Sequence, residues 1–153
     1  MKRVLHWIVP YLVAFLSLVF LLEMVNRGTA EASSSYDELY NEASQSIQEV
    51  NRRTPYRAGP GLRIDSVSIS RSTGIRYRQT FTEIYPGHVD RQTSLRNQRL
   101  VRDSTINSDC NNEAIARLIL GGIAITRHFH YASGEKAFTV IADRSACQHA
   151  GHM

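Results

Sequence analysis

The chain has 153 residues, a formal net charge of +4 and 42% hydrophobic residues. This length leaves room for one domain of ordinary size after an apolar N-terminal stretch, which excludes a chain of several domains. The sequence contains no internal repeat and no low-complexity segment.

Residues 4–22 carry no charged side chain and follow the basic pair Lys2-Arg3. As a helix, this stretch would reach about 28 Å, close to the thickness of the hydrocarbon core of a bilayer. It predicts a signal-anchor, which would make the protein a single-pass protein of the bacterial inner membrane with its C-terminal domain in the periplasm. The alternative is a signal peptide cleaved near Ala32, after an A-x-A site, with release into the periplasm. Both alternatives export residues 33–153.

The exported part is predicted to begin with a helix that ends before Pro55. Ser35 and Glu38 have the spacing of a capping box. Thr54 precedes a proline and is pushed out of helical geometry, so the helix ends there. Apolar residues recur on one face at helical spacing and predict a core-facing stripe: Tyr36, Leu39, Tyr40, Ala43, Ile47 and Val50.

Two strands are predicted next, over residues 62–70 and 75–81, with a turn at Ser72-Thr73-Gly74 between them. The apolar positions change parity between Ile64 and Val67, which predicts a bulge at Asp65-Ser66. These two runs have the pattern of a hairpin.

Residues 90–107 are polar and basic and predict a helix without a clean apolar stripe. A short capped helix follows, with apolar residues from Ala114 to Ile119, and ends at Gly121-Gly122. Two further alternating runs, residues 123–131 and 137–142, surround Gly134 and predict a second antiparallel hairpin.

These elements predict an α+β fold, in the order N-terminal membrane helix, helix, hairpin, helices, hairpin. The four strands are expected to form one antiparallel sheet with the helices on one face. We expect residues 1–32 to be the signal-anchor or signal peptide with a short linker, residues 33–148 to be the exported domain, and residues 149–153 to be a loose tail.

The two cysteines, Cys110 and Cys147, predict one disulfide, because exported proteins meet an oxidising compartment. A shared metal site would need closely spaced ligands, and these two residues stand far apart in the sequence. The bond would tie the short helix to the end of the second hairpin.

Basic and imidazole side chains supply the candidate binding residues. Between Val50 and Arg102 there are eleven arginines and no lysine, and arginine forks suit phosphate and carboxylate groups. Solvated surface is the competing interpretation. His128 and His130 lie two residues apart on one strand and could share a zinc or copper ion. The candidate binding arginines are Arg63, Arg71, Arg76 and Arg78.

The order of elements and a few short motifs resemble small exported bacterial proteins of uncharacterised function, some described as virulence factors regulated by quorum sensing. The motifs are Asn51-x-x-Thr54-Pro55 after a helix, Asp65-Ser66-Val67 on a strand, Tyr77 on the next strand, and the pattern of Cys110, short helix, Gly122, strand, Gly134, strand and Cys147. Arg127 and His130 depart from it, since aromatic residues are expected there. The resemblance implies a fold and a compartment, and no activity.

The combined pattern favours a non-catalytic envelope protein that binds another envelope component, as an accessory subunit of a secretion or transfer machine or as an inhibitor or immunity factor. A periplasmic zinc or copper-binding protein and a cell-wall or lipid-directed enzyme are the alternatives. No G-x-S-x-G motif or glycine-rich phosphate loop is present, so no catalytic residue and no cofactor is predicted. The expected partners are the inner membrane, through residues 4–22, and an envelope protein or anionic surface. Nucleic acid is not expected outside the inner membrane.

Overall fold

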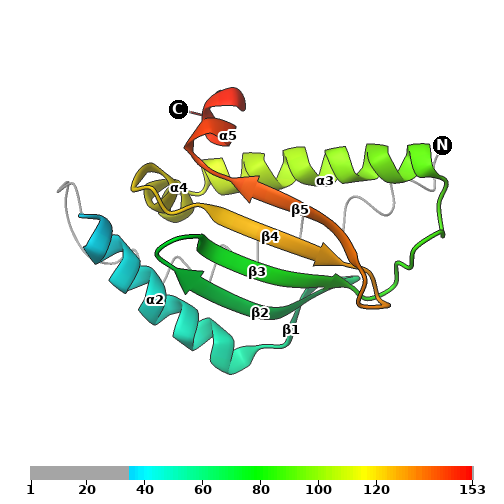
Figure 1. Ribbon diagram of the computed structural model, residues 1–153, viewed down its shortest axis with the longest axis horizontal. Coiled ribbons are helices and arrows are strands. Elements are labelled where there is room, and N and C mark those ends of the chain that lie inside the picture. The colour runs from blue at the N-terminus through cyan, green and yellow to red at the C-terminus, as the bar shows by residue number, and fades with distance from the viewer. Residues whose placement is uncertain (1–34, 153) are drawn as a thin grey trace.

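The computed structural model describes residues 35–152. The helices and two hairpins predicted in this range are present, and the structure adds β1 and α5 (Figure 1). The elements in chain order are α2 (Tyr36–Arg53), β1 (Tyr56–Gly59), β2 (Leu62–Ser70), β3 (Gly74–Phe81), α3 (Arg91–Asn111), α4 (Glu113–Leu120), β4 (Ile125–His130), β5 (Lys136–Ala142) and α5 (Arg144–His149).

The strands form one five-stranded mixed sheet in the order β1-β2-β3-β4-β5. Strand β3 pairs with β4 in parallel, and the other neighbours pair antiparallel. The predicted four-stranded antiparallel sheet is therefore wrong in two respects. The short strand β1 adds a fifth strand at one edge, and the two hairpins join through a parallel pair. The bulge predicted at Asp65-Ser66 is confirmed by a register shift between Ile64 and Ser66.

The parallel pair follows from the connection between the two hairpins. The chain leaves the end of β3, runs through α3 and α4, and re-enters the sheet at the end where β3 began, as a parallel crossover requires. Gly74 permits the close approach at that end. Its φ is +67°, and a Cβ atom on it would lie 2.2 Å from the backbone oxygen of Ala124.

The core lies between the sheet and its helices. Helix α2 packs on β2 and α3 packs on β5, and the two helices lie along opposite edges of the sheet in Figure 1. The predicted apolar stripe of α2 faces inward, with Leu39, Ala43 and Ile47 buried. Each large side chain buried in this way contributes about 1.5–3 kcal/mol. The other core residues include Ile64, Val67, Ile75, Ile115, Leu118, Ile119, Ile123, Ile125, Phe129 and Val140.

Asn51 docks the end of α2 onto β2. Its Oδ1 accepts a hydrogen bond from the Val67 amide at 2.9 Å, and its Nδ2 donates to the Val67 carbonyl oxygen. Asn51 and Val67 belong to two of the short motifs that resemble the exported bacterial proteins. Their contact gives hydrogen-bond partners to backbone groups next to the bulge of β2.

We expect Asn51→Ala to lower the free energy of unfolding by about 2 kcal/mol, because it leaves a part-buried backbone donor and acceptor without partners. Urea denaturation would measure the change. Asn111→Ala on α3 is the matched control, since Asn111 is exposed and should cost less than about 0.5 kcal/mol. Equal effects at the two positions would show that the Asn51 contact is not important for stability.

No helix within residues 35–152 is both long enough and apolar enough to cross a bilayer. The membrane helix predicted at residues 4–22 lies outside the described residues. The assignment as a single-pass inner-membrane protein is corrected accordingly, because the described structure gives it no support.

Cys110 and Cys147 form the predicted disulfide, with their Cα atoms 5.5 Å apart. Cys110 lies near the end of α3, and Cys147 lies in α5, directly after β5. Both side chains are buried. The bond therefore fastens α5, and with it the end of the edge strand β5, to α3.

Candidate functional site

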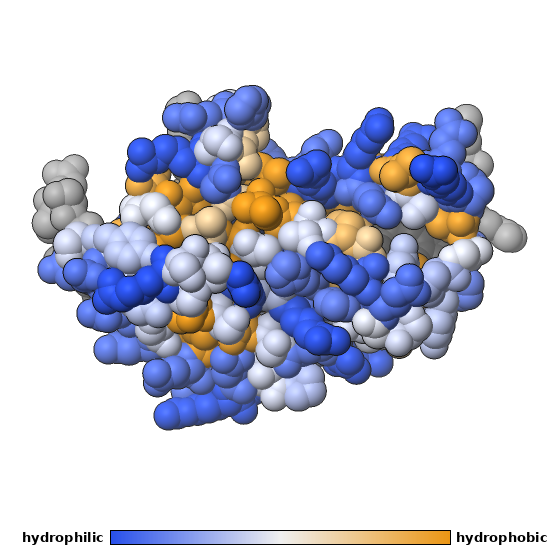
Figure 2. Space-filling model, in the orientation of Figure 1, coloured by the Kyte–Doolittle hydropathy of each residue, from blue (hydrophilic) through white to orange (hydrophobic). Residues whose placement is uncertain are grey.

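One side of the sheet carries no helix in the described part of the chain, and it is basic. Burial alternates from Ile75 to Gln79 of β3 and along β4, so that every second residue of these segments points away from the helices. The strand registers place five permanent cations on this side: Arg57, Arg63, Arg76, Arg78 and Lys136. We call this surface the basic face. In Figure 2 hydrophilic side chains cover the middle strands, with a smaller apolar area towards the end of β5.

Cross-strand pairing arranges the basic face in rows. One row runs from Ser66 through Arg78 and His128 to Thr139 across four strands. The next row runs through Ser68, Arg76, Thr126 and Ile141. Arg76 and Arg78 are therefore neighbours on one face of β3, and short hydroxyl side chains of β2, β4 and β5 flank them in both rows.

Asp65 at the bulge is the acidic side chain on the strands of the basic face. It accepts a hydrogen bond from Arg63 Nε at 2.5 Å and from the Thr80 hydroxyl at 2.6 Å, and Arg78 Nε lies 3.9 Å away. Arg63 and Arg78 nevertheless remain 46% and 54% exposed. One carboxylate thus orients two arginines from the bulge and leaves an excess of positive charge.

The structure brings together three of the four predicted binding arginines. Arg63, Arg76 and Arg78 share the basic face. Arg71 lies in the turn before β3, where it pairs with Asp37 and stacks over the Tyr40 ring at 4.7 Å from the centroid. The interaction with Asp37 raises the pKa of Arg71 above its ordinary value. Arg71 therefore belongs to the contact between this turn and α2.

His128 and His130 also lie on the basic face. Their Nδ1 atoms contact the Thr139 hydroxyl at 3.0 Å and the Gly134 carbonyl oxygen at 3.1 Å. Within residues 35–152, no group of three or more His, Cys, Asp or Glu side chains is placed to hold a metal ion. Partial burial lowers the pKa of His128, and the positive charges of Lys136, Arg76 and His130 lower it further. The two histidines thus lie in a positive field.

The sequence did not predict the buried ion pair that lies between the sheet and α3. Arg127 on β4 and Asp109 on α3 are each 1% exposed, and Arg127 Nη2 lies 2.6 Å from Asp109 Oδ1. The guanidinium also stacks over Tyr77 at 4.6 Å from the ring centroid. Burial alone would lower the pKa of Arg127, but the Asp109 carboxylate more than offsets this, and the pKa is raised. The sequence does contain a signal for this burial. Arg127 lies two residues from Ile125 and two from Phe129, so it points to the same, buried side of β4.

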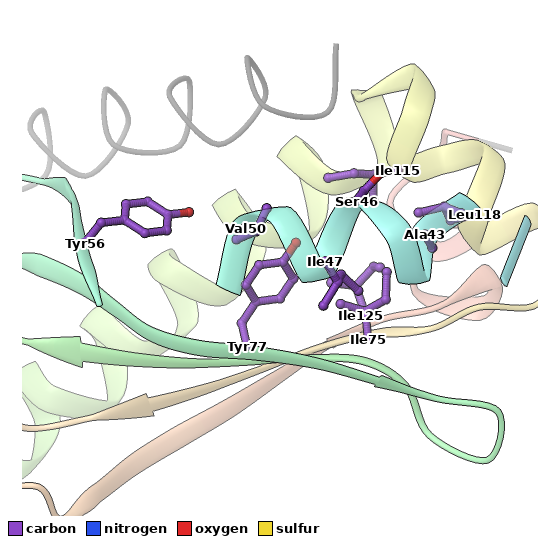
Figure 3. Close-up of a pocket in the computed structure, with 10 residues that line it drawn as sticks. All are labelled: Ala43, Ser46, Ile47, Val50, Tyr56, Ile75, Tyr77, Ile115, Leu118 and Ile125. Carbon is purple, nitrogen blue, oxygen red and sulfur yellow. The ribbon is translucent and has the colours of Figure 1, made fainter. Parts of the chain in front are cut away.

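A small cavity lies between α2, α4 and the sheet (Figure 3). Its volume is about 30 Å³, enough for about one water molecule and far below a small-molecule site. Figure 3 shows Ile47 and Val50 of α2 above Tyr77 of the sheet, with Tyr56 to one side. Burial raises the pKa of Tyr56 to about 12, so the phenol is neutral at physiological pH. The cavity is therefore a minor gap in the core packing.

No family model matches the sequence, and no curated protein matches it. Three solved structures have a similar fold. A "putative secreted protein" of Pseudomonas aeruginosa aligns with 17% identity and a TM-score of 0.55, over 78% of this chain and 99% of its own. This neighbour agrees with the predicted resemblance to small exported bacterial proteins.

The other two structures are pilotins. EpsS of the Vibrio vulnificus type 2 secretion system has 15% identity and a TM-score of 0.55, over 74% of this chain and 94% of its own. AspS of the type II secretion system of Vibrio cholerae has 17% identity and a TM-score of 0.53, over 73% of this chain and 94% of its own. At these identities the likeness establishes the fold alone.

Proposed function

We propose that this protein is a non-catalytic accessory subunit of a bacterial secretion machine, which acts in the cell envelope by binding another component of that machine. The observation that carries the proposal is a fold shared with two type II secretion pilotins over 94% of their length. The disulfide supports an envelope location, because such bonds persist in oxidising compartments. On this proposal the protein is released into the periplasm after cleavage near Ala32.

The geometry of the described residues supports binding better than catalysis. Five exposed cations share a broad sheet face, and the cavity in the core is too small for a substrate. A sheet face built from paired strands is rigid, which favours recognition of a partner by fixed side chains.

Photo-crosslinking in living cells would test this proposal. A photoreactive amino acid would replace Arg78 on the basic face and, in a separate variant, Arg96 on α3, so that both sides of the domain are sampled. We expect mass spectrometry to identify subunits of a secretion machine among the crosslinked products from one of these positions. We also expect deletion of the gene to reduce protein secretion several-fold. Unchanged secretion, with no machine subunit crosslinked from either side, would overturn the proposal.

A further inference from the structure

We propose that the basic face is a docking surface for a bilayer that contains anionic phospholipids. Its five cations stand on four of the five strands, β1, β2, β3 and β5. At the usual strand spacing, the face is about 19 Å across from β1 to β5. A lipid surface presents phosphate groups over an area of this kind, and arginine forks bind phosphate oxygens with two parallel hydrogen bonds.

The residue types on the basic face favour a lipid surface over a protein partner. The centre of a protein interface is apolar and depleted of charge, with aromatic anchors that fill pockets. On the strands of the basic face, Ile141 is the large exposed apolar side chain, at 47% exposure. The other side chains in the rows from Ser66 to Thr139 and from Ser68 to Ile141 are arginine, histidine, serine and threonine, and Lys136 and Asp65 add one charge of each sign to this face. This surface can therefore recognise a ligand mainly by charge complementarity, which suits the phosphate groups of anionic lipids.

The electrostatics of the basic face favour contact with an anionic surface. Within residues 35–152, Arg57, Arg76 and Lys136 form no ion pair, whereas Arg63 is paired with Asp65. The groups that face His128 are cationic or neutral: Arg76 and Arg78 from β3, His130 on β4, and Lys136 and Thr139 from β5. These positive charges repel the protonated form of His128. An anionic surface placed against the basic face would offset that repulsion and favour the protonated imidazole.

Vesicle binding by the full-length protein tests the inference. We would compare vesicles of phosphatidylcholine alone with vesicles that also contain phosphatidylglycerol. The readout is the ratio of the two affinities, so that any contribution of the apolar residues 4–22 cancels. The variant with Arg57→Gln, Arg76→Gln and Arg78→Gln should lose about a hundred-fold of its preference for the anionic vesicles at low salt. This follows from about five-fold per basic residue near an anionic surface.

A matched variant controls for net charge. Arg96→Gln, Arg99→Gln and Arg102→Gln remove the same charge from exposed positions of α3, on the other side of the domain. This variant should keep most of the preference for anionic vesicles. Raising the salt concentration should reduce the preference of the wild type, because the screening length falls to about 8 Å at physiological ionic strength. Equal losses in the two triple variants would overturn the inference.

The pKa of His128 provides a test on the unmodified protein. Nuclear magnetic resonance would follow the imidazole during a pH titration with a short-chain phosphatidylglycerol and, separately, with a short-chain phosphatidylcholine. We expect the anionic lipid to raise the pKa of His128 and the neutral lipid to leave it unchanged. Identical titration curves in both lipids would overturn the inference. Crosslinking of the basic face to an acidic protein, without any preference for anionic vesicles, would overturn it too. None of these measurements depends on whether the protein serves a secretion machine.

Discussion

Replacing Cys110 or Cys147 by serine should lower the free energy of unfolding by about 4 kcal/mol. The bond closes a segment with a sequence separation of 37, and the loss of loop-closure entropy in the unfolded chain gives a value of this size. That is a large part of the roughly 5–15 kcal/mol that stabilises a typical domain. The structure adds a local reason, since α5 has only six residues and is too short to be stable without tertiary contacts.

Chemical denaturation of the oxidised protein and of each variant would measure this effect. The two single variants and the Cys110→Ser/Cys147→Ser double variant should unfold at similar denaturant concentrations, because each lacks the same bond. Ser108→Ala on the same helix is a control that keeps the bond, and its change should be much smaller. Two free thiols in denatured wild-type protein, isolated under alkylating conditions, would contradict the prediction.

Removing one partner of the Arg127–Asp109 pair should destabilise the protein by about 3–5 kcal/mol. Both side chains are 1% exposed, so Asp109→Ala leaves a buried guanidinium without its carboxylate, and Arg127→Met leaves the carboxylate without its guanidinium. The double variant Arg127→Met/Asp109→Leu buries no charge, and should be far more stable than either single variant. The apolar pair can even match the wild type, because an ion pair repays the cost of its desolvation only in part.

A double-mutant cycle by urea denaturation would measure the coupling between Arg127 and Asp109. The exposed pair of Arg52 and Glu49, whose side chains are 77% and 50% exposed, is the matched control. Glu49→Ala should cost less than about 1 kcal/mol, since solvent screens a surface pair. If Asp109→Ala cost no more than Glu49→Ala, the buried pair would not contribute to stability as inferred.

The prediction of the fold was most successful where the controlling interactions are local. The capping box of Ser35 and Glu38 is present at the start of α2, and the helix ends at Arg53 with Thr54 as its C-cap, before a proline, as expected. The bulge in β2 was predicted because the apolar positions change parity between Ile64 and Val67, and the register of β2 and β3 shifts there. In each case the determining contacts lie within a few positions of the chain, so the sequence is sufficient to predict them.

The candidate site could be predicted in part. Alternation along β2 and β3 placed Arg63, Arg76 and Arg78 on one face, because side chains on a strand point to opposite sides with a period of two. The same alternation kept His128 and His130 together. Arg71 was predicted to belong to the same set of binding arginines, and it lies in the turn between β2 and β3. The turn directs it instead to Asp37, 34 residues earlier in the chain.

The sequence by itself determined the helices, the two hairpins, the bulge and the side of the strands on which most arginines lie, since these depend on spacing and short-range geometry. Only the tertiary structure decided that β3 and β4 are parallel, that β1 joins the sheet, and that Arg127 is buried. Pairing of strands is a contact between distant segments, and several arrangements satisfy the same local pattern. Arg127 is tolerated in the core because Asp109, 18 residues away on α3, supplies the opposite charge.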